Sequence, residues 1–470
     1  MRSRSRLKAI PAIIYTALLI LVCASGPFHE APSDVKSLIG SAPVTEVTLS
    51  CGTYPVETTE LTAVIQSEDV AKLDALSYLT RADFSGSSCV DEIYQWAQAH
   101  PDVKVKYTVT LPDGQVLSSS EQSLDLSELT DSAVSDTLTD SAVDGTVQAL
   151  AYLPKVSSIQ LGSERSDLGW DSVRAIMDAC PNASVSYAFW LYDKEFSTVD
   201  TTINLSHIPV EDDGAQVMQA MACMPNLVSV DMDSCGVSNE DMAAIRDAYP
   251  DVKVIWRVWF GDAYSVRTDV ERILASQPSH GGMLDRYNSE ALKYCTDVKY
   301  LDVGHNDALD DISFVAYMPK LEVAILAMDN WSDATPLASC TELEYLEMQT
   351  TLCTDLSPLS GLKNLRHLNI AYIVDLEDIS PLYSLTELER LWVGCYNHVP
   401  AEQIDEMRAA APNCEVNDTV YDDPTGGRWR YVDYNDKAYI FILHPRYEKL
   451  REQFGYTSAD FAFYWNDPLY

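Results

Sequence analysis

Basic residues are scarce in this 470-residue chain, in which 32 lysines and arginines stand against 71 aspartates and glutamates. The formal net charge is −39 at pH 7, and such a chain repels nucleic-acid phosphates and anionic lipid head groups. We therefore expect neither nucleic acid nor an anionic membrane surface as a partner. Basic proteins, neutral glycans and cations are compatible with this charge, and so is a simple contribution of the charge to solubility.

The sequence also lacks the short motifs of common catalytic and metal centres. Its eight histidines and eleven cysteines form no H-x-x-x-H, H-E-x-x-H or CxxC spacing. The run 231–236 begins like a calcium loop, but Met242 stands where a bidentate glutamate is required. Cys395 and His398 are close in sequence without the context of a cysteine nucleophile. We expect no enzyme activity, metal or cofactor, with a hydrolase that uses the aromatic tail as the enzymatic alternative.

Long hydrophobic runs are absent except at the N-terminus. Four basic residues lie within the first eight positions and precede an apolar run of 14 residues over 9–22. The run is shorter than the ~20 residues that cross a bilayer, so we predict a secretory signal peptide over 1–25. A lipid anchor at Cys23 is the alternative, although Val22 is a poor residue for the preceding position. The mature chain is expected to be extracellular or at the cell surface, without a transmembrane span.

A repeat dominates the C-terminal half of the chain. The stretches 355–370 (DLSPLSGLKNLRHLNI) and 378–393 (DISPLYSLTELERLWV) agree at Asp, Ser, Pro, Leu and every later apolar position. A strand-like pattern, apolar-x-x-apolar-x-apolar, occurs in five copies that begin at Val298, Leu321, Leu343, Leu365 and Leu388. A second motif, Asp-x-Ser/Thr-x-Leu/Val, keeps the same period and begins at Asp311, Asp333, Asp355 and Asp378.

This pattern resembles the leucine-rich repeat, in particular its 22-residue internalin-like subclass, because L-x-x-L-x-L at a period of 20–29 residues is that family's signature. The resemblance implies an α/β solenoid, or horseshoe, with a parallel concave sheet and helices and turns on the convex side. Copies must stack because one repeat cannot bury its apolar face alone. The resemblance further implies an exported bacterial protein that recognises another protein, or secondly a glycan, without catalysis. A purely structural envelope component is the other alternative.

The N-terminal half carries a longer period. Equivalent positions, spaced 74, 71 and 71 residues apart, are held by Leu79, Leu153, Met224 and Cys295. Related second motifs begin at His100, Cys180 and Tyr249, and related strand-like runs are SLDLS over 123–127 and TINLS over 202–206. Three repeats of about 24 residues fit each unit. We therefore predict three strands per unit in a more helical, ribonuclease-inhibitor-like style, with an amphipathic helix before Tyr249.

The repeat register predicts the domain boundaries. We expect a linker over 26–43, long-period modules over 44–288 and 22/23-residue repeats over 289–417. An aromatic tail over 418–470 would cap the open end of the solenoid, since terminal repeats need a cover. The acidic, Ser/Thr-rich segment 118–143 is expected to be a surface loop.

Cysteines occupy core positions of the repeat. Cys295 and Cys340 stand where other copies have Leu or Met, and Cys414 stands where others have Val. Free cysteine commonly behaves as a small buried hydrophobe. We expect these three thiols to be buried and mostly unpaired, and the chain to hold few or no disulfides.

Residues between the leucines are expected to point from the concave face into solvent, in three columns across the repeats. The columns are Tyr300, Val323, Tyr345, His367 and Arg390; Asp302, Ile325, Glu347, Asn369 and Trp392; and His305, Met328, Thr350, Tyr372 and Cys395. Aromatic residues and arginine are enriched in interface cores, although single exposed apolar residues are normal. The predicted binding site comprises Tyr300, Asp302, His305, Ile325, Met328, Tyr345, Glu347, His367, Asn369, Tyr372, Arg390 and Trp392.

Overall fold

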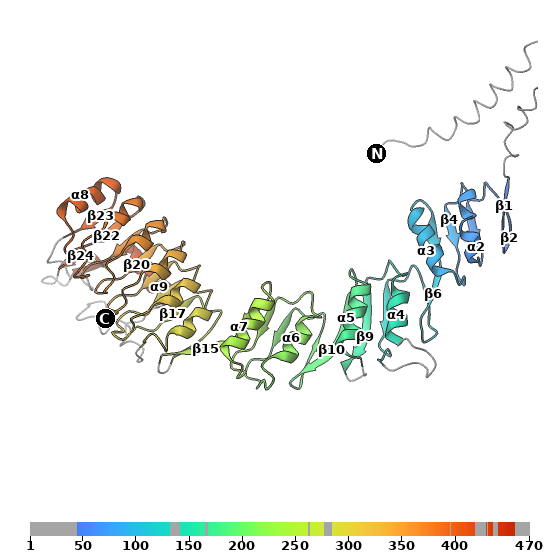
Figure 1. Ribbon diagram of the computed structural model, residues 1–470, viewed down its shortest axis with the longest axis horizontal. Helices are drawn as coiled ribbons and strands as arrows, with labels where there is room; N and C mark the ends of the chain where they lie inside the picture. The colour runs from blue at the N-terminus through green and yellow to red at the C-terminus, as the bar shows by residue number, and fades with distance from the viewer. Residues whose placement is uncertain are drawn as a thin grey trace, which may run out of the picture. The chain divides into compact units, whose positions relative to one another are not determined.

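The structure is a computed structural model that describes residues 45–131, 142–164, 168–261, 264–276, 284–394, 396–418, 429, 431–435 and 440–455 (Figure 1). The predicted signal peptide and linker lie outside the described residues, as do Cys23 and Cys395. Among the described segments, no helix combines the length and hydrophobicity that a membrane crossing requires. The chain divides into two compact units. The described part of the first runs to Glu121 and also includes Gln148–Lys155, and the second holds the remainder.

The first unit contains one long-period module. Its strands β3 (Glu60–Thr62), β4 (Arg81–Asp83) and β5 (Lys104–Lys106) form a parallel sheet, with α2 (Ser67–Val70), η2 (Leu73–Ala75) and α3 (Val90–Ala99) between them. Antiparallel pairs flank this sheet in sequence, namely β1 (Glu46–Leu49) with β2 (Gly52–Pro55) and β6 (Thr108–Thr110) with β7 (Val116–Ser118). Leu61, Ala82 and Ile93 are buried. The prediction of three strands per module is therefore confirmed in this unit.

The second unit begins with two further modules. The first has parallel β8 (Ser123–Leu126), β9 (Ser158–Ser163) and β10 (Ser184–Leu191), and β10 turns back into β11 (Lys194–Ser197). Its helices are α5 (Trp170–Ala179) and α4 (Ala142–Leu150), although the last three residues of α4 are assigned to the first unit. The next has parallel β12 (Thr202–Asn204), β13 (Ser229–Asp231) and β14 (Lys253–Ile255), with α6 (Ala215–Met221) and α7 (Asn239–Ala248). The helix predicted before Tyr249 is α7. The surface-loop prediction for 118–143 is wrong at β8, whose Leu124 and Leu126 enter the core, and 132–141 lie outside the described residues.

A β-hairpin, which was not expected from the sequence, ends each module, and in the second module the last parallel strand β10 is also its first arm. The third hairpin joins β15 (Arg257–Phe260) to β16 (Tyr264–Arg267). In each hairpin a buried hydroxyl residue, Ser119, Thr198 or Thr268, closes the pair. The side-chain hydroxyl accepts a hydrogen bond from the backbone N–H of Tyr107, Tyr187 or Trp256, at 3.0, 2.9 and 3.2 Å respectively. The backbone N–H of the hydroxyl residue in turn donates to the backbone carbonyl of that same aromatic residue. The same device therefore ends all three modules.

The 22/23-residue repeats build one seven-stranded parallel sheet in sequence order. Its strands are β17 (Arg272–Leu274), β18 (Tyr300–Asp302), β19 (Val323–Ile325), β20 (Tyr345–Glu347), β21 (His367–Asn369), β22 (Arg390–Trp392) and β23 (Glu415–Asn417). Each strand pairs in register with its equivalent one repeat later, so that the predicted columns run straight across the sheet. The central residues Leu301, Leu346 and Leu391 are fully buried. These features confirm the predicted leucine-rich repeat solenoid.

Among the described residues, each return segment between β17 and β22 contains one 3-10 helix. These are η4 (Glu290–Tyr294), η5 (Ser313–Tyr317), η6 (Thr335–Ser339), η7 (Ser357–Gly361) and η8 (Ser380–Ser384), and α8 (Ala401–Ala410) follows. The repeated aspartates Asp311, Asp333, Asp355 and Asp378 each accept the N–H of the residue two positions later, at 2.7–2.9 Å. Such Asx turns start the helices, because they satisfy a backbone donor that the short helix leaves unpaired.

Candidate recognition surface

Most predicted site residues lie beneath other side chains. We call the side of β17–β23 that carries the first two columns the sheet face. Tyr345 and Trp392 are only 3% and 2% exposed. Six more of the predicted residues are also buried: Asp302, Ile325, Glu347, His367, Asn369 and Arg390. The expectation that the first two columns face solvent is therefore wrong. The remaining predicted site residues are half-buried: Tyr300, His305, Met328 and Tyr372.

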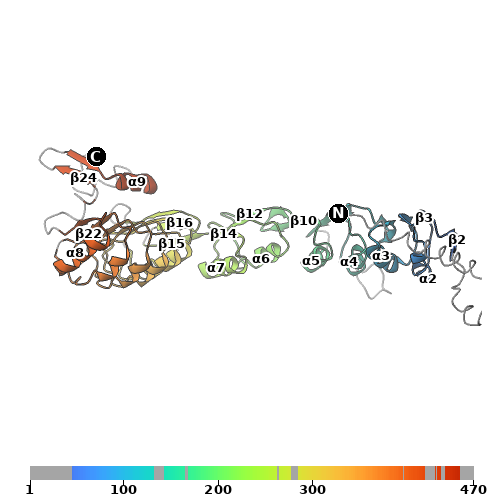
Figure 2. The same cartoon turned by 90° about the horizontal axis from the view of Figure 1, so that it is seen from above.

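The chain's own tail covers the sheet face. Its described residues comprise Trp429, the antiparallel pair β24 (Tyr431–Asn435) and β25 (Ile440–Leu443), and α9 (Pro445–Phe454) (Figure 2). Trp429, Tyr447, Leu450 and Phe454 form one apolar cluster with Val323, Ile325, Tyr345 and Trp392. The described tail thus covers the sheet face and not the open end of the solenoid, which was its expected place. On that face its Trp429, Tyr447, Leu450 and Phe454 side chains are removed from water, which favours the contact.

Trp429 makes hydrogen bonds and ring contacts with the sheet face. Its indole N–H lies 2.8 Å from both the Tyr345 hydroxyl and a Glu347 carboxylate oxygen, each of which can accept it. Its carbonyl accepts from the Arg390 guanidinium, which also stacks over its ring at 5.3 Å. The Trp392 ring meets the Trp429 ring edge-on at 5.6 Å. Residues of β20 and β22 therefore contact one tail side chain.

Charged and polar groups surround this contact. Arg446 of α9 lies over the Tyr345 ring at 5.4 Å and 3.6 Å from Glu344, and burial lowers its pKa. The rings of His367 and His444 are 5.4 Å apart. Among the described residues, His367 Nδ1 and Trp392 Nε1 are buried without a hydrogen-bond partner, and Arg446 Nη2 makes only its ion pair with Glu344. Buried polar groups are satisfied in about 90% of cases or more, so two orphaned atoms at one contact are unusual.

The third column lies at the edge of the sheet. In each repeat from β18 to β22 one residue just past the strand has a left-handed backbone, with φ between 58° and 63°: His305, Met328, Thr350, Tyr372 and Tyr396. In the last repeat this residue is Tyr396, one position beyond Cys395, where the column was predicted. The column therefore marks the turn by which the chain leaves the sheet, and the tail cluster does not include it.

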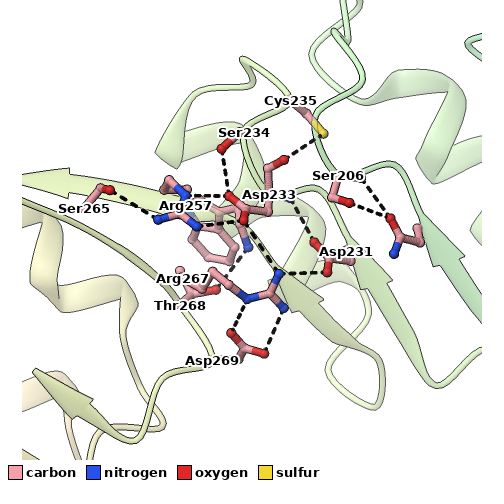
Figure 3. Close-up of polar contacts among 12 residues, drawn as sticks. Ser206, Asp231, Asp233, Ser234, Cys235, Arg257, Ser265, Arg267, Thr268 and Asp269 are labelled. Atoms are coloured by element: carbon pink, nitrogen blue, oxygen red, sulfur yellow. Dashed lines mark hydrogen bonds and ion pairs between the residues drawn. The ribbon is translucent and has the colours of Figure 1, made fainter.

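A second polar cluster lies on β13 and the hairpin β15–β16 (Figure 3). Asp233 accepts two hydrogen bonds from Arg257, at 2.7 and 2.9 Å, which lower its pKa to about 2. Arg267 bridges Asp231 and Asp269 at 2.9 and 3.0 Å. The two aspartates that begin the calcium-like run are thus paired with arginines. Within the described residues, no group of three or more His, Cys, Asp or Glu side chains is arranged to hold a metal.

Strands 22 or 23 residues apart pair in one parallel sheet above stacked leucines, and this decides the architecture. The chain folds as a leucine-rich repeat solenoid. No protein-family model and no curated protein matches it.

Similar solved structures include an internalin, InlF, from Listeria monocytogenes, with 15% identity over 78% of this chain and 85% of that one, at a TM-score of 0.26. A leucine-rich repeat protein from Leptospira interrogans shares 13% identity over 74% of this chain and 91% of its own, at a TM-score of 0.29. At these scores the likenesses carry no argument about function.

Proposed function

We propose that this leucine-rich repeat protein is an exported, non-enzymatic recognition protein that binds a protein partner on the sheet face around Tyr345 and Trp392. The observation that carries the proposal is that this face already holds a polypeptide segment, the chain's own Trp429 and α9. The proposal of export is based on the basic residues and the short apolar run at the N-terminus.

The chemistry of the contact is that of an interface centre. Aromatic and arginine side chains dominate binding energy at interfaces, and Tyr345, Arg390 and Trp392 supply both kinds. Two carboxylates, Glu347 and Glu344, lie beside the tail's indole N–H and guanidinium. A partner segment with an aromatic residue and a nearby arginine would meet the same groups. It would compete with the tail for them.

The unsatisfied polar atoms favour a tail that can be displaced. A buried donor without a partner costs about 1–3 kcal/mol, so a permanent core seldom keeps several together. Trp392 Nε1 and His367 Nδ1 lie on the sheet face, whereas Arg446 Nη2 of the tail keeps an ion pair with Glu344. A partner that satisfied the first two atoms would recover part of that cost. This supports a sheet face adapted to a ligand other than the tail.

The experiment presents the tail sequence in trans. A labelled peptide of residues 429–455 is titrated into the full-length double variant Trp429→Ala/Tyr447→Ala, whose own tail has lost two anchors. We expect the peptide to bind this variant and to bind the wild-type chain more weakly, because the tethered tail competes at high effective concentration. Adding Trp392→Ala should weaken peptide binding by about tenfold or more.

Trp259→Ala is the matched control, because Trp259 is 67% exposed on β15 and lies outside the sheet-face cluster. It should leave peptide binding unchanged. A double variant whose α9 exchanges its amide hydrogens rapidly, yet binds no peptide, would contradict the proposal. Binding of a glycan but of no peptide would make glycan, the second class of partner, the better assignment.

A further inference from the structure

Three of the most exposed apolar side chains lie together where consecutive strands end. Leu352, Val374 and Tyr396 are 60%, 54% and 65% exposed. Leu352 and Val374 hold the same repeat position, two residues past the left-handed residues Thr350 and Tyr372. Tyr396 is the left-handed residue of the next repeat, and its ring lies 5.6 Å from that of Tyr372. Leu352 and Val374 hold equivalent positions in neighbouring repeats, and Tyr396 packs on Tyr372, two residues before Val374, so the three lie along one edge of the stacked repeats.

The charge around this patch has one sign. We call the segments 328–334, 350–356, 372–379 and 396–400 the rim. The rim contains no lysine or arginine, and its exposed carboxylates are Asp333, Asp355, Asp375, Glu377 and Asp378. Hydrogen bonds from Thr335, Ser357 and Ser380 lower the pKa of Asp333, Asp355 and Asp378, so these three are ionised at neutral pH. Exposed apolar groups are therefore bordered by carboxylates without a compensating base.

We propose that the rim binds a basic amphipathic segment of a partner protein, with the partner's apolar side chains on Leu352, Val374 and Tyr396 and its lysines or arginines on the bordering carboxylates. Charge complementarity selects this occupant, because an acidic segment would be repelled and a purely polar one would leave the apolar patch in water. The inference rests on the proposed recognition function but uses a surface outside the cluster that the described tail residues form.

The test uses the full-length chain and a synthetic helical peptide with leucines on one face and lysines on the other. We expect this peptide to bind, and two peptides of the same length, one with glutamate for lysine and one with serine for leucine, to bind at least about tenfold more weakly. The triple variant Leu352→Ser/Val374→Ser/Tyr396→Ser should lose about tenfold or more in affinity for the leucine–lysine peptide. The variant Asp375→Asn/Glu377→Gln should also weaken binding of the leucine–lysine peptide, and the difference from the wild-type chain should shrink as the salt concentration rises.

The matched control is Val228→Ser/Tyr287→Ser/Tyr317→Ser, which removes three exposed apolar side chains elsewhere in the same unit. It should bind like the wild-type chain. Equal binding by the rim and control variants, or equal binding of the leucine–lysine and serine–lysine peptides, would overturn the rim proposal in favour of general charge attraction. Because the tail stays in place throughout, this outcome would leave the sheet-face proposal standing, and failure of the tail-peptide experiment would not affect the rim result.

Discussion

His367 lies in an environment that changes its ordinary acid–base chemistry. It lies between the rings of Tyr345, Trp429 and His444. Burial lowers its pKa to about 3, and the positive charges of His444, Arg446 and Arg390 add to the effect. Glu347 accepts from Trp429 at the same contact, and Glu415 and Glu389 oppose the lowered pKa of His444. The docked tail therefore requires a neutral imidazole.

This requirement predicts that the tail is released in acid. A histidine whose pKa is depressed on docking stabilises the docked state above pH ~6.5, and the stabilisation is lost as the pH falls from 6.5 towards 3. The expected loss for His367 alone is about 2 kcal/mol at pH 5. Hydrogen exchange of α9 should rise as the pH falls, after correction for intrinsic exchange rates. In His367→Phe the pH dependence should be smaller, and an unchanged profile in that variant would assign the effect to other groups.

The cysteines give a second prediction at this scale. All nine described cysteines are free, and Cys295 and Cys340 are fully buried. Burial raises the pKa of these two thiols to about 12 and about 11, so little thiolate exists at neutral pH. Cys414 is half-buried, and its pKa is also raised to about 12. A thiol reagent should label exposed Cys51 quickly in the native chain and the other three only after denaturation. Rapid native labelling of Cys295 would mean that its repeat is not packed as described.

At the scale of elements, the solenoid repeats and the tail should respond differently to truncation of their contacts. Leu346→Ala removes a fully buried side chain from the middle of β20, and a cavity of this kind costs about 2–5 kcal/mol. Trp392→Ala removes a contact between β22 and the tail but leaves the leucine core intact. We expect the first variant to lower the unfolding free energy of the repeats and the second mainly to expose α9.

Denaturant unfolding and hydrogen exchange of α9 separate these two effects. Ile325→Val, a smaller change at the same tail contact, should give a weaker version of the Trp392→Ala result. If Trp392→Ala instead unfolded β21 and β22, the tail would be part of the folding core of the repeats and not a cover laid upon them.

For the whole molecule, the prediction is export. The basic N-terminal residues and the short apolar run over 9–22 predict that the mature chain begins near Gly26. Expression in a bacterial host, followed by N-terminal sequencing of the released or surface-held protein, checks this. A chain with Met1 intact in the cytosolic fraction would contradict it, and a lipid-modified N-terminal Cys23 would support the anchored alternative.

The sequence by itself determined the period of the repeats, the register of the columns and the positions of the buried leucines and cysteines. These features follow from local periodicity, since each repeat meets an equivalent partner 22 or 23 residues away. The tertiary structure alone decided that the tail lies on the sheet face. Trp429 and Tyr345 are 84 residues apart, and no repeat relates them. Their contact depends on the shape of the two surfaces and on the apolar area that they bury, and the repeat pattern of the sequence contains neither quantity. For the same reason the columns were predicted in the right register and with the wrong exposure.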